Sequence, residues 1–245
     1  MSVRTADPQD VVLRVIRSLF VLVAAWTAAF AVVAPVDGLA TILGVAPDTA
    51  VYEVTRTVAQ FVGFALACVA FLYYAEERDL VSVRRPSRRE AGLIVGGLVG
   101  LLAVQFALLF GLQALGIGTG QNRAITAAGR TPVYFLLMIP VSLLVVGPAE
   151  ELLFRGVVQG HVRDAVGAPG GIAFASLLFG AIHLPGVMGG LPAQVAYVGV
   201  ATVLGAILGV LYERTDNVVV PSLTHGGYNA VLFGIQYATV IGVLG

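Results

Sequence analysis

Apolar runs of about 20 residues recur along the whole chain, and no other feature constrains the fold as strongly. An α-helix of that length crosses the hydrocarbon core of a bilayer, where lipid covers the apolar side chains. Only 11% of the 245 residues are charged, against about a quarter in a soluble domain. The sequence therefore predicts an all-α fold, a polytopic transmembrane helical bundle.

Seven or eight membrane helices are expected, because the last apolar range is either one long helix or two short ones broken near Gly234. The predicted helices cover residues 14–35, 56–75, 91–115, 132–158, 170–183, 192–212 and 218–245. Residues 1–130 hold about three helices with no assigned role, and residues 131–245 hold the polar residues discussed below. Both parts are expected to form one integral membrane unit.

Arginines, the only basic residues besides histidine, predict the orientation in the membrane. Five of them crowd the loop after the second helix, and three lie at the amino terminus, before the first apolar run. Positive loops stay in the cytoplasm, so we expect a multi-pass protein of the cell membrane with a cytoplasmic amino terminus. Membrane lipids are expected partners, and the zero net charge argues against a nucleic-acid partner.

The adjacent carboxylates Glu150 and Glu151 lie within an apolar segment. A charge at bilayer depth costs about 2.5–3.5 kcal/mol on insertion scales, so each needs a role. Glu151 and Arg155 are four residues apart on a helix and can pair, whereas Glu150 points about 100° away and is free to exchange a proton. The alternative is that the helix ends early and both glutamates lie at the wet interface.

Three histidines are present. His161 is expected at the surface and is given no role. His183 follows Phe179 by one helical turn, so the two rings can pack together, and His225 shares a helix face with Asn229. The expected depths of these side chains and Glu150 allow one shared cavity, which we expect to open toward the cytoplasm.

Three motifs in order, Glu150-Glu151-x-x-x-Arg155, Phe179-x-x-x-His183 and His225-x-x-x-Asn229, resemble those of the CPBP family. This family of intramembrane endopeptidases, also called ABI, processes CAAX proteins and bacteriocins. The resemblance covers roughly residues 130–245. Within the family, the chain is similar to the type II CAAX prenyl endopeptidases.

The resemblance implies hydrolysis of a peptide bond in a membrane-associated or prenylated protein substrate, without a cofactor. Glu150 and His183 would activate a water, and His225 and Asn229 would hold the oxyanion. Glu151, Arg155 and Phe179 would support the site. Attack on an amide requires a base near the water and donors aimed at the oxyanion, so these residue types suit the chemistry.

Three alternatives remain open on the sequence. Glu150, His183 and His225 could hold Zn²⁺ with a bound water, which an assay with a chelator would reveal. A proton-coupled membrane transporter could use Glu150 as a relay, although the polar residues are confined to the second half of the chain. A membrane scaffold without activity would have no need of all four polar groups.

Overall fold

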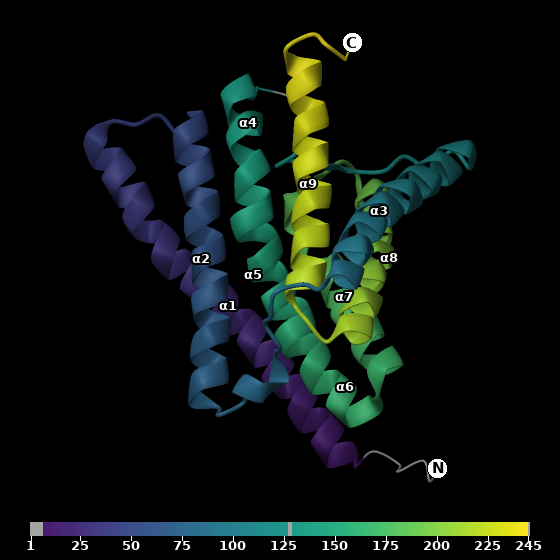
Figure 1. Cartoon of the computed structure of the whole chain (residues 1–245). Coiled ribbons are helices and arrows are strands. Elements are labelled where there is room, and N and C mark those ends of the chain that lie inside the picture. Colours follow the sequence, from purple (N-terminus) through teal and green to yellow (C-terminus); the bar gives the residue numbers. More distant parts are fainter. Residues whose placement is uncertain (1–6, 127–128, 245) are drawn as a thin grey trace.

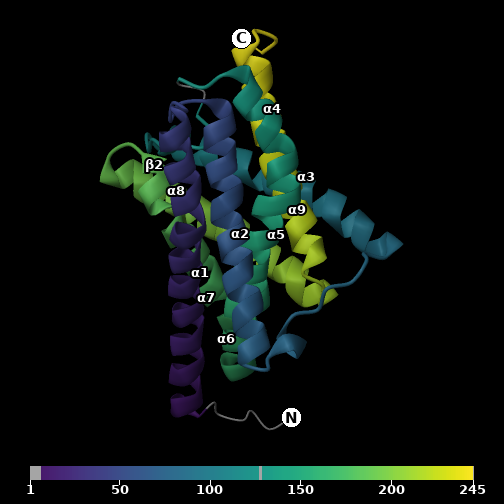
Figure 2. The same ribbon diagram turned by 90° about the vertical axis from the view of Figure 1, so that its left-hand side faces the viewer.

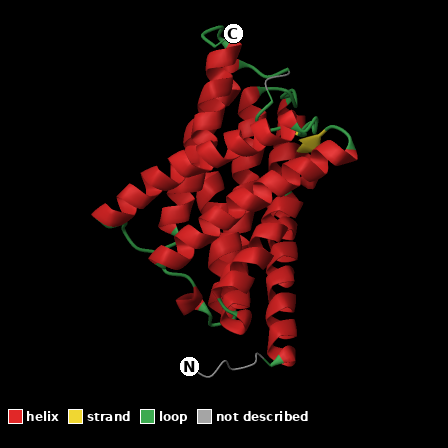
Figure 3. Cartoon of the chain, turned by 90° about the vertical axis from the view of Figure 1, so that its right-hand side faces the viewer, coloured by secondary structure: helices red, strands yellow, loops and turns green. Residues whose placement is uncertain are grey.

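The computed structural model describes residues 7–126 and 129–244, and helices make up nearly all of that part (Figures 1 and 3). The predicted all-α helical bundle is confirmed. Arg4, one of the three arginines at the amino terminus, lies outside the described residues. In chain order the elements are α1 Pro8–Leu43, α2 Ala50–Tyr74, α3 Arg88–Ala114, β1 Gln121–Asn122, α4 Pro132–Val141, α5 Gly147–Glu151, α6 Gly160–Val166, α7 Ala168–Ile182, β2 Val187–Met188, α8 Leu191–Thr215 and α9 Val219–Val240.

One continuous helix contains α4, α5 and α6, because the segments between them are π-helical rather than loops. These π-helical segments are Ser142–Val146 and Leu152–Gln159. The predicted helix ended at residue 158, but the observed one continues to Val166. Both glutamates therefore lie inside the helix, and the alternative that they occupy a wet helix end is wrong.

Six helical stretches are long and apolar enough to cross a membrane in the described part of the chain. They are Pro8–Leu43, Ala50–Tyr74, Arg88–Ala114, Pro132–Val166, Ala168–Gly186 and Leu191–Thr215. The chain is thus a multi-pass membrane protein. The last range forms one helix, α9, of 22 residues without a break near Gly234. Its polar residues, which include His225 and Asn229, make it less apolar than the other six.

Successive long helices run in alternating directions, so their ends gather on two faces of the bundle (Figure 1). We call one the amino-terminal face; it holds the start of α1 and the connections at residues 75–87, 167 and 216–218. The opposite face holds the connections at residues 44–49, 115–131 and 183–190 and the end of α9. On that face β1 pairs antiparallel with β2 and links the last two of these connections.

Helix α1 begins earlier and ends later than residues 14–35. Asp7 caps its start by accepting a hydrogen bond from the Gln9 backbone N–H at 2.9 Å, and Pro8 occupies the first turn. Its first turn, with Gln9 and Asp10, is polar, so hydropathy alone does not detect it. The helix also continues past Pro35 to the left-handed Gly44. Helices α1 and α2 lie side by side (Figure 2).

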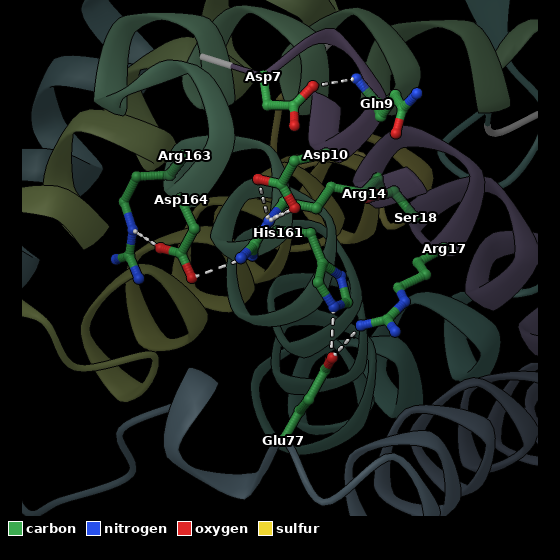
Figure 4. A network of polar contacts seen from close by, with 10 residues as sticks. All are labelled: Asp7, Gln9, Asp10, Arg14, Arg17, Ser18, Glu77, His161, Arg163 and Asp164. Atoms are coloured by element: carbon green, nitrogen blue, oxygen red, sulfur yellow. Dashed lines mark hydrogen bonds and ion pairs between the residues drawn. The ribbon is translucent and has the colours of Figure 1, made fainter. Parts of the chain in front are cut away.

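His161 is buried, so its expected place at the surface is wrong. Its Nε2 atom lies 2.5 Å from a carboxylate oxygen of Glu77, and Arg17 donates to the other Glu77 oxygen at 2.6 Å (Figure 4). Its ring also packs edge-on against Phe71. The error arose because Glu77 is 84 residues away in the chain, and only the tertiary fold brings it to His161. These contacts join α1, α2 and α6 at the amino-terminal face.

Candidate active site

Two π-helical segments flank Glu150 and Glu151 and set their direction. Each π turn contains an extra residue, which rotates the following side chains relative to a regular α-helix, and such turns are frequent at functional sites. Glu150 is 6% exposed and Glu151 is fully buried. The helix therefore holds two carboxylates inside the bundle, where each requires polar partners.

Close packing between α5 and α9 brings the segments that carry the first and third motifs together. A Cβ atom added to Gly147 would lie 2.7 Å from the Ser222 carbonyl oxygen, and one added to Gly226 would lie 2.7 Å from the Ser142 carbonyl oxygen. Both distances are far below van der Waals contact, so only glycine fits at these two positions. His225, next to Gly226, is thereby held beside the paired glutamates.

Glu151 contacts two side chains, Arg155 and His225, whereas the sequence predicts only the contact with Arg155. The predicted pair with Arg155 is present, with Arg155 Nε 3.1 Å from Glu151 Oε2, and both side chains are fully buried. Glu151 Oε1 lies 2.9 Å from His225 Nδ1. A carboxylate paired with Arg155 can only accept, so the Nδ1–H of His225 donates to it. The sequence reasoning missed this second contact, because 74 residues separate the two side chains.

The other nitrogen of His225 faces Glu150 and Asn229. Its Nε2 atom lies 3.6 Å from Glu150 Oε2 and 3.2 Å from Asn229 Nδ2. His225 and Asn229 share a face of α9 as predicted. The result is one polar chain from Arg155 through Glu151 and His225 to Asn229, with Glu150 at its side.

His183 is fixed by its own helix end and by an aromatic ring. Its Nδ1 atom lies 2.7 Å from the Phe179 carbonyl oxygen, which can only accept, so Nδ1 carries the proton. The Nε2 atom then keeps a lone pair available to accept a proton or a hydrogen bond. The Phe179 ring packs edge-on against both imidazoles, with centroid distances of 4.8 Å to His183 and 5.5 Å to His225.

Arg155 lies under the same phenyl ring. Its Cζ atom is 5.4 Å from the Phe179 centroid, within the range of a cation–π contact, and its Nη1 atom lies 3.5 Å from the Ser176 hydroxyl oxygen. A Cβ atom on Gly205 of α8 would lie 3.3 Å from Nη2, so α8 passes close to the guanidinium. Phe179 therefore packs against a cation and two imidazoles at once.

A cavity of about 1390 Å³ contains the site. All four residues expected to carry the chemistry line it, namely Glu150, His183, His225 and Asn229. Two lining residues were not anticipated. The hydroxyl of Tyr197 accepts a hydrogen bond from Asn122, and the Tyr197 ring centroid lies 6.3 Å from that of His183. The second residue is Ser142, whose buried hydroxyl has no partner among the described residues. Neither stands out in its apolar stretch of sequence.

The cavity extends toward the face opposite the amino-terminal face. Most lining residues come from the half of their helix nearer that face, such as Glu53 near the start of α2 and Gln236 near the end of α9, whereas His225 and Asn229 lie in the first half of α9. Residues of the connection before α4, including Asn122 and Arg123, line its outer end. A cytoplasmic amino terminus and a cavity that opens toward the cytoplasm were both expected. These two expectations exclude one another in this fold.

Metal binding was kept as an alternative for Glu150, His183 and His225. Among residues 7–126 and 129–244, no group of three or more His, Cys, Asp or Glu side chains is placed to hold a metal ion. Glu150 and His225 approach one another, and His183 reaches the same cavity from α7.

Comparisons with known proteins identify the family. Residues 132–231 match the family described as type II CAAX prenyl endopeptidase Rce1-like. The uncharacterized protein YpbD of Bacillus subtilis (strain 168), which is of the CPBP family, is 36% identical over 171 residues, or 69% of this chain and 80% of YpbD. No solved structure matches the chain. The chain therefore belongs to the CPBP family of CAAX-type intramembrane proteases.

Proposed function

We propose that this chain hydrolyses a peptide bond of a membrane-associated substrate by means of a water activated by Glu150 and His183. The observation that carries the proposal is the shared cavity, which is lined by both the buried carboxylate of Glu150 and the imidazole of His183, whose tautomer is fixed. Family membership favours a hydrolase over the transporter alternative. The substrate class follows from the membrane environment: a peptide segment that reaches the bilayer.

The proposed reaction begins with a water between Glu150 and His183. One O–H of the water donates to the lone pair of His183 Nε2, which orients it, and the Glu150 carboxylate takes the other proton as the oxygen attacks the carbonyl carbon. Collapse of the tetrahedral intermediate breaks the C–N bond. Glu150 then returns its proton to the leaving nitrogen, which yields an amine and a carboxylic acid that keeps the second proton of the water.

His225 and Asn229 are proposed to stabilise the tetrahedral oxyanion. Both contribute nitrogen atoms at the same point of the cavity, 3.2 Å apart. For this role His225 Nε2 must carry a proton, and the buried Glu151 carboxylate at Nδ1 stabilises that imidazolium form. Asn229 then turns its Nδ2–H from His225 to the oxyanion. Donors aimed at the developing charge are often the largest single contribution to such catalysis.

We expect Asn229→Ala to lower kcat by about 10²–10³ and to leave KM nearly unchanged, because the donor acts mainly in the transition state. His225→Ala should do at least as much, and the double variant should fall short of additive. The measurement is steady-state hydrolysis of a fluorogenic peptide by the purified protein. A raised KM with kcat intact would assign Asn229 to ground-state binding. Release of bound zinc by His225→Ala would favour the metal alternative.

Orientation is also part of the proposal. Among the described residues, nine arginines lie at the amino-terminal face and three at the opposite face. The nine are Arg14, Arg17, Arg78, Arg84, Arg85, Arg88, Arg89, Arg163 and Arg214, and the three are Arg56, Arg123 and Arg130. Arginine-rich ends remain in the cytoplasm. The amino-terminal face is therefore proposed to be cytoplasmic, in the cell membrane.

A further inference from the structure

We infer that the active-site cavity takes its substrate from the extracytoplasmic side of the membrane, as an exported or membrane-anchored peptide segment. The inference rests on the proposed function for what happens in the cavity. It adds the side of access, which excludes substrates confined to the cytoplasm, among them a prenylated cytoplasmic tail.

The amino-terminal face is closed. Ion pairs join the helices there, with Arg14 3.4 Å from Asp164 and Arg17 2.6 Å from Glu77 (Figure 4). His161 also contacts Glu77, which gives a third polar contact between elements at this face. Between these contacts and the site, the continuous helix is packed on every side, since residues 153–162 are all buried. A substrate from this face would have to separate α1 from α6.

The opposite face, in contrast, is hollow. The cavity reaches from Glu150, near mid-helix, to exposed residues of that face, among them Pro47, Gln121 and Arg123. Its acidic and basic residues there are largely paired, as Arg56 is with Asp37 at 2.6 Å and Arg130 with Glu53 at 3.1 Å. The route from this face to the site therefore requires no helix to move.

The wall of the cavity also suits a peptide. Three neutral amides, Gln60, Gln105 and Gln236, line it between the outer end and the site. The Oε1 atom of Gln105 is buried without a hydrogen-bond partner among the described residues. An amide side chain both donates and accepts, which suits the backbone of an extended peptide. The remaining wall is largely apolar, as expected for a peptide that leaves the bilayer surface to enter it.

Combined with the arginine distribution, these arguments place the hollow face outside the cell. A charge count of nine against three is a strong bias under the positive-inside rule, which counts arginines near helix ends. The inference thus depends on two independent features, the direction of the cavity and the orientation of the bundle. Each can be measured separately.

The orientation test uses single-cysteine labelling of the full chain in intact cells with a membrane-impermeant maleimide. Gln121→Cys, at an exposed position of the cavity's outer end, should be labelled without permeabilisation. Arg85→Cys, exposed in the arginine-rich loop, should be labelled only after permeabilisation. The unchanged chain is the control, since its single cysteine, Cys68, is buried. Asp48→Cys, exposed on the same face as Gln121, serves as a second outer position.

Labelling of Gln121→Cys and Asp48→Cys only in permeabilised cells would overturn the inference, as would labelling of Arg85→Cys in intact cells. These readouts need no peptidase activity. A second arm couples a bulky maleimide–polyethylene glycol to each purified variant and measures hydrolysis of a fluorogenic peptide. The label should lower hydrolysis by about tenfold or more at Gln121→Cys, because it covers the access route, and leave Arg85→Cys unaffected.

The reverse pattern of inhibition would overturn the direction of access. Absence of hydrolysis in both unlabelled variants and in the unchanged chain would instead contradict the proposed function. In that case the labelling in cells still decides which face of the cavity lies outside. The two failures are therefore distinguishable.

Discussion

Glu150→Gln should lower kcat by about 10³ or more while the protein stays folded, because the amide keeps the size of the side chain but cannot take a proton from water. A general base alone accounts for about 10²–10⁴ in rate. Among the described residues Glu150 pairs with no arginine and lies 3.6 Å from His225 Nε2, so its neutral replacement strands no buried guanidinium there. Thermal unfolding should therefore remain close to that of the unchanged protein.

The matched control is Glu53→Gln, which removes a carboxylate from the same cavity at its outer end. Glu53 pairs with Arg130 in a partly exposed site, where an ion pair contributes about 0–1 kcal/mol. Hydrolysis by this variant should stay close to that of the unchanged protein. An equal loss in both variants would show that cavity charge, rather than a base at position 150, determines the rate.

Glu151→Gln is expected to have the largest effect on stability. It places an amide between two donors, Arg155 and His225, and leaves the fully buried guanidinium without its counter-charge. Breaking a buried pair by removing one partner costs about 3–5 kcal/mol. Purified yield and the unfolding midpoint should both fall sharply. Asp37→Asn, which disrupts the exposed pair with Arg56, is the control and should change the midpoint little.

The bridge made by Glu151 also changes the expectation for a charge swap. Glu151→Arg combined with Arg155→Glu restores a pair on the helix, and on the sequence alone partial recovery of yield is expected. In the structure an arginine at position 151 would face the His225 Nδ1–H, so two donors would meet. We therefore expect no recovery of activity. Normal yield with equal loss of activity in Glu150→Gln and Glu151→Gln would contradict this division of roles.

Local spacing predicted the contacts within one helix. Glu151 with Arg155, Phe179 with His183 and His225 with Asn229 are each four residues apart, and an α-helix places such pairs on one face. The membrane helices were predictable for a similar reason, since a continuous apolar run has few alternatives in lipid. The exact ends of the helices were less predictable, because a polar turn such as the start of α1 extends a helix beyond its apolar run.

Contacts between helices were not predictable from one sequence. The bond between Glu151 and His225 depends on how closely α5 and α9 approach, which Gly147 and Gly226 set. The π-helical turns around Glu150 have no simple sequence signature, and the burial of His161 requires a partner 84 residues away. The direction of the cavity likewise follows from how all the helices diverge, and the sequence carried no sign of it.

The most direct test of the central claim compares peptides released from native membranes by the purified protein and by its Glu150→Gln variant. If the chain cleaves peptide bonds with Glu150, new carboxy and amino termini from membrane or exported proteins should accumulate with the unchanged protein and be absent with the variant. Mass spectrometry of the released peptides measures both. Identical sets of peptides from the two samples would contradict the claim.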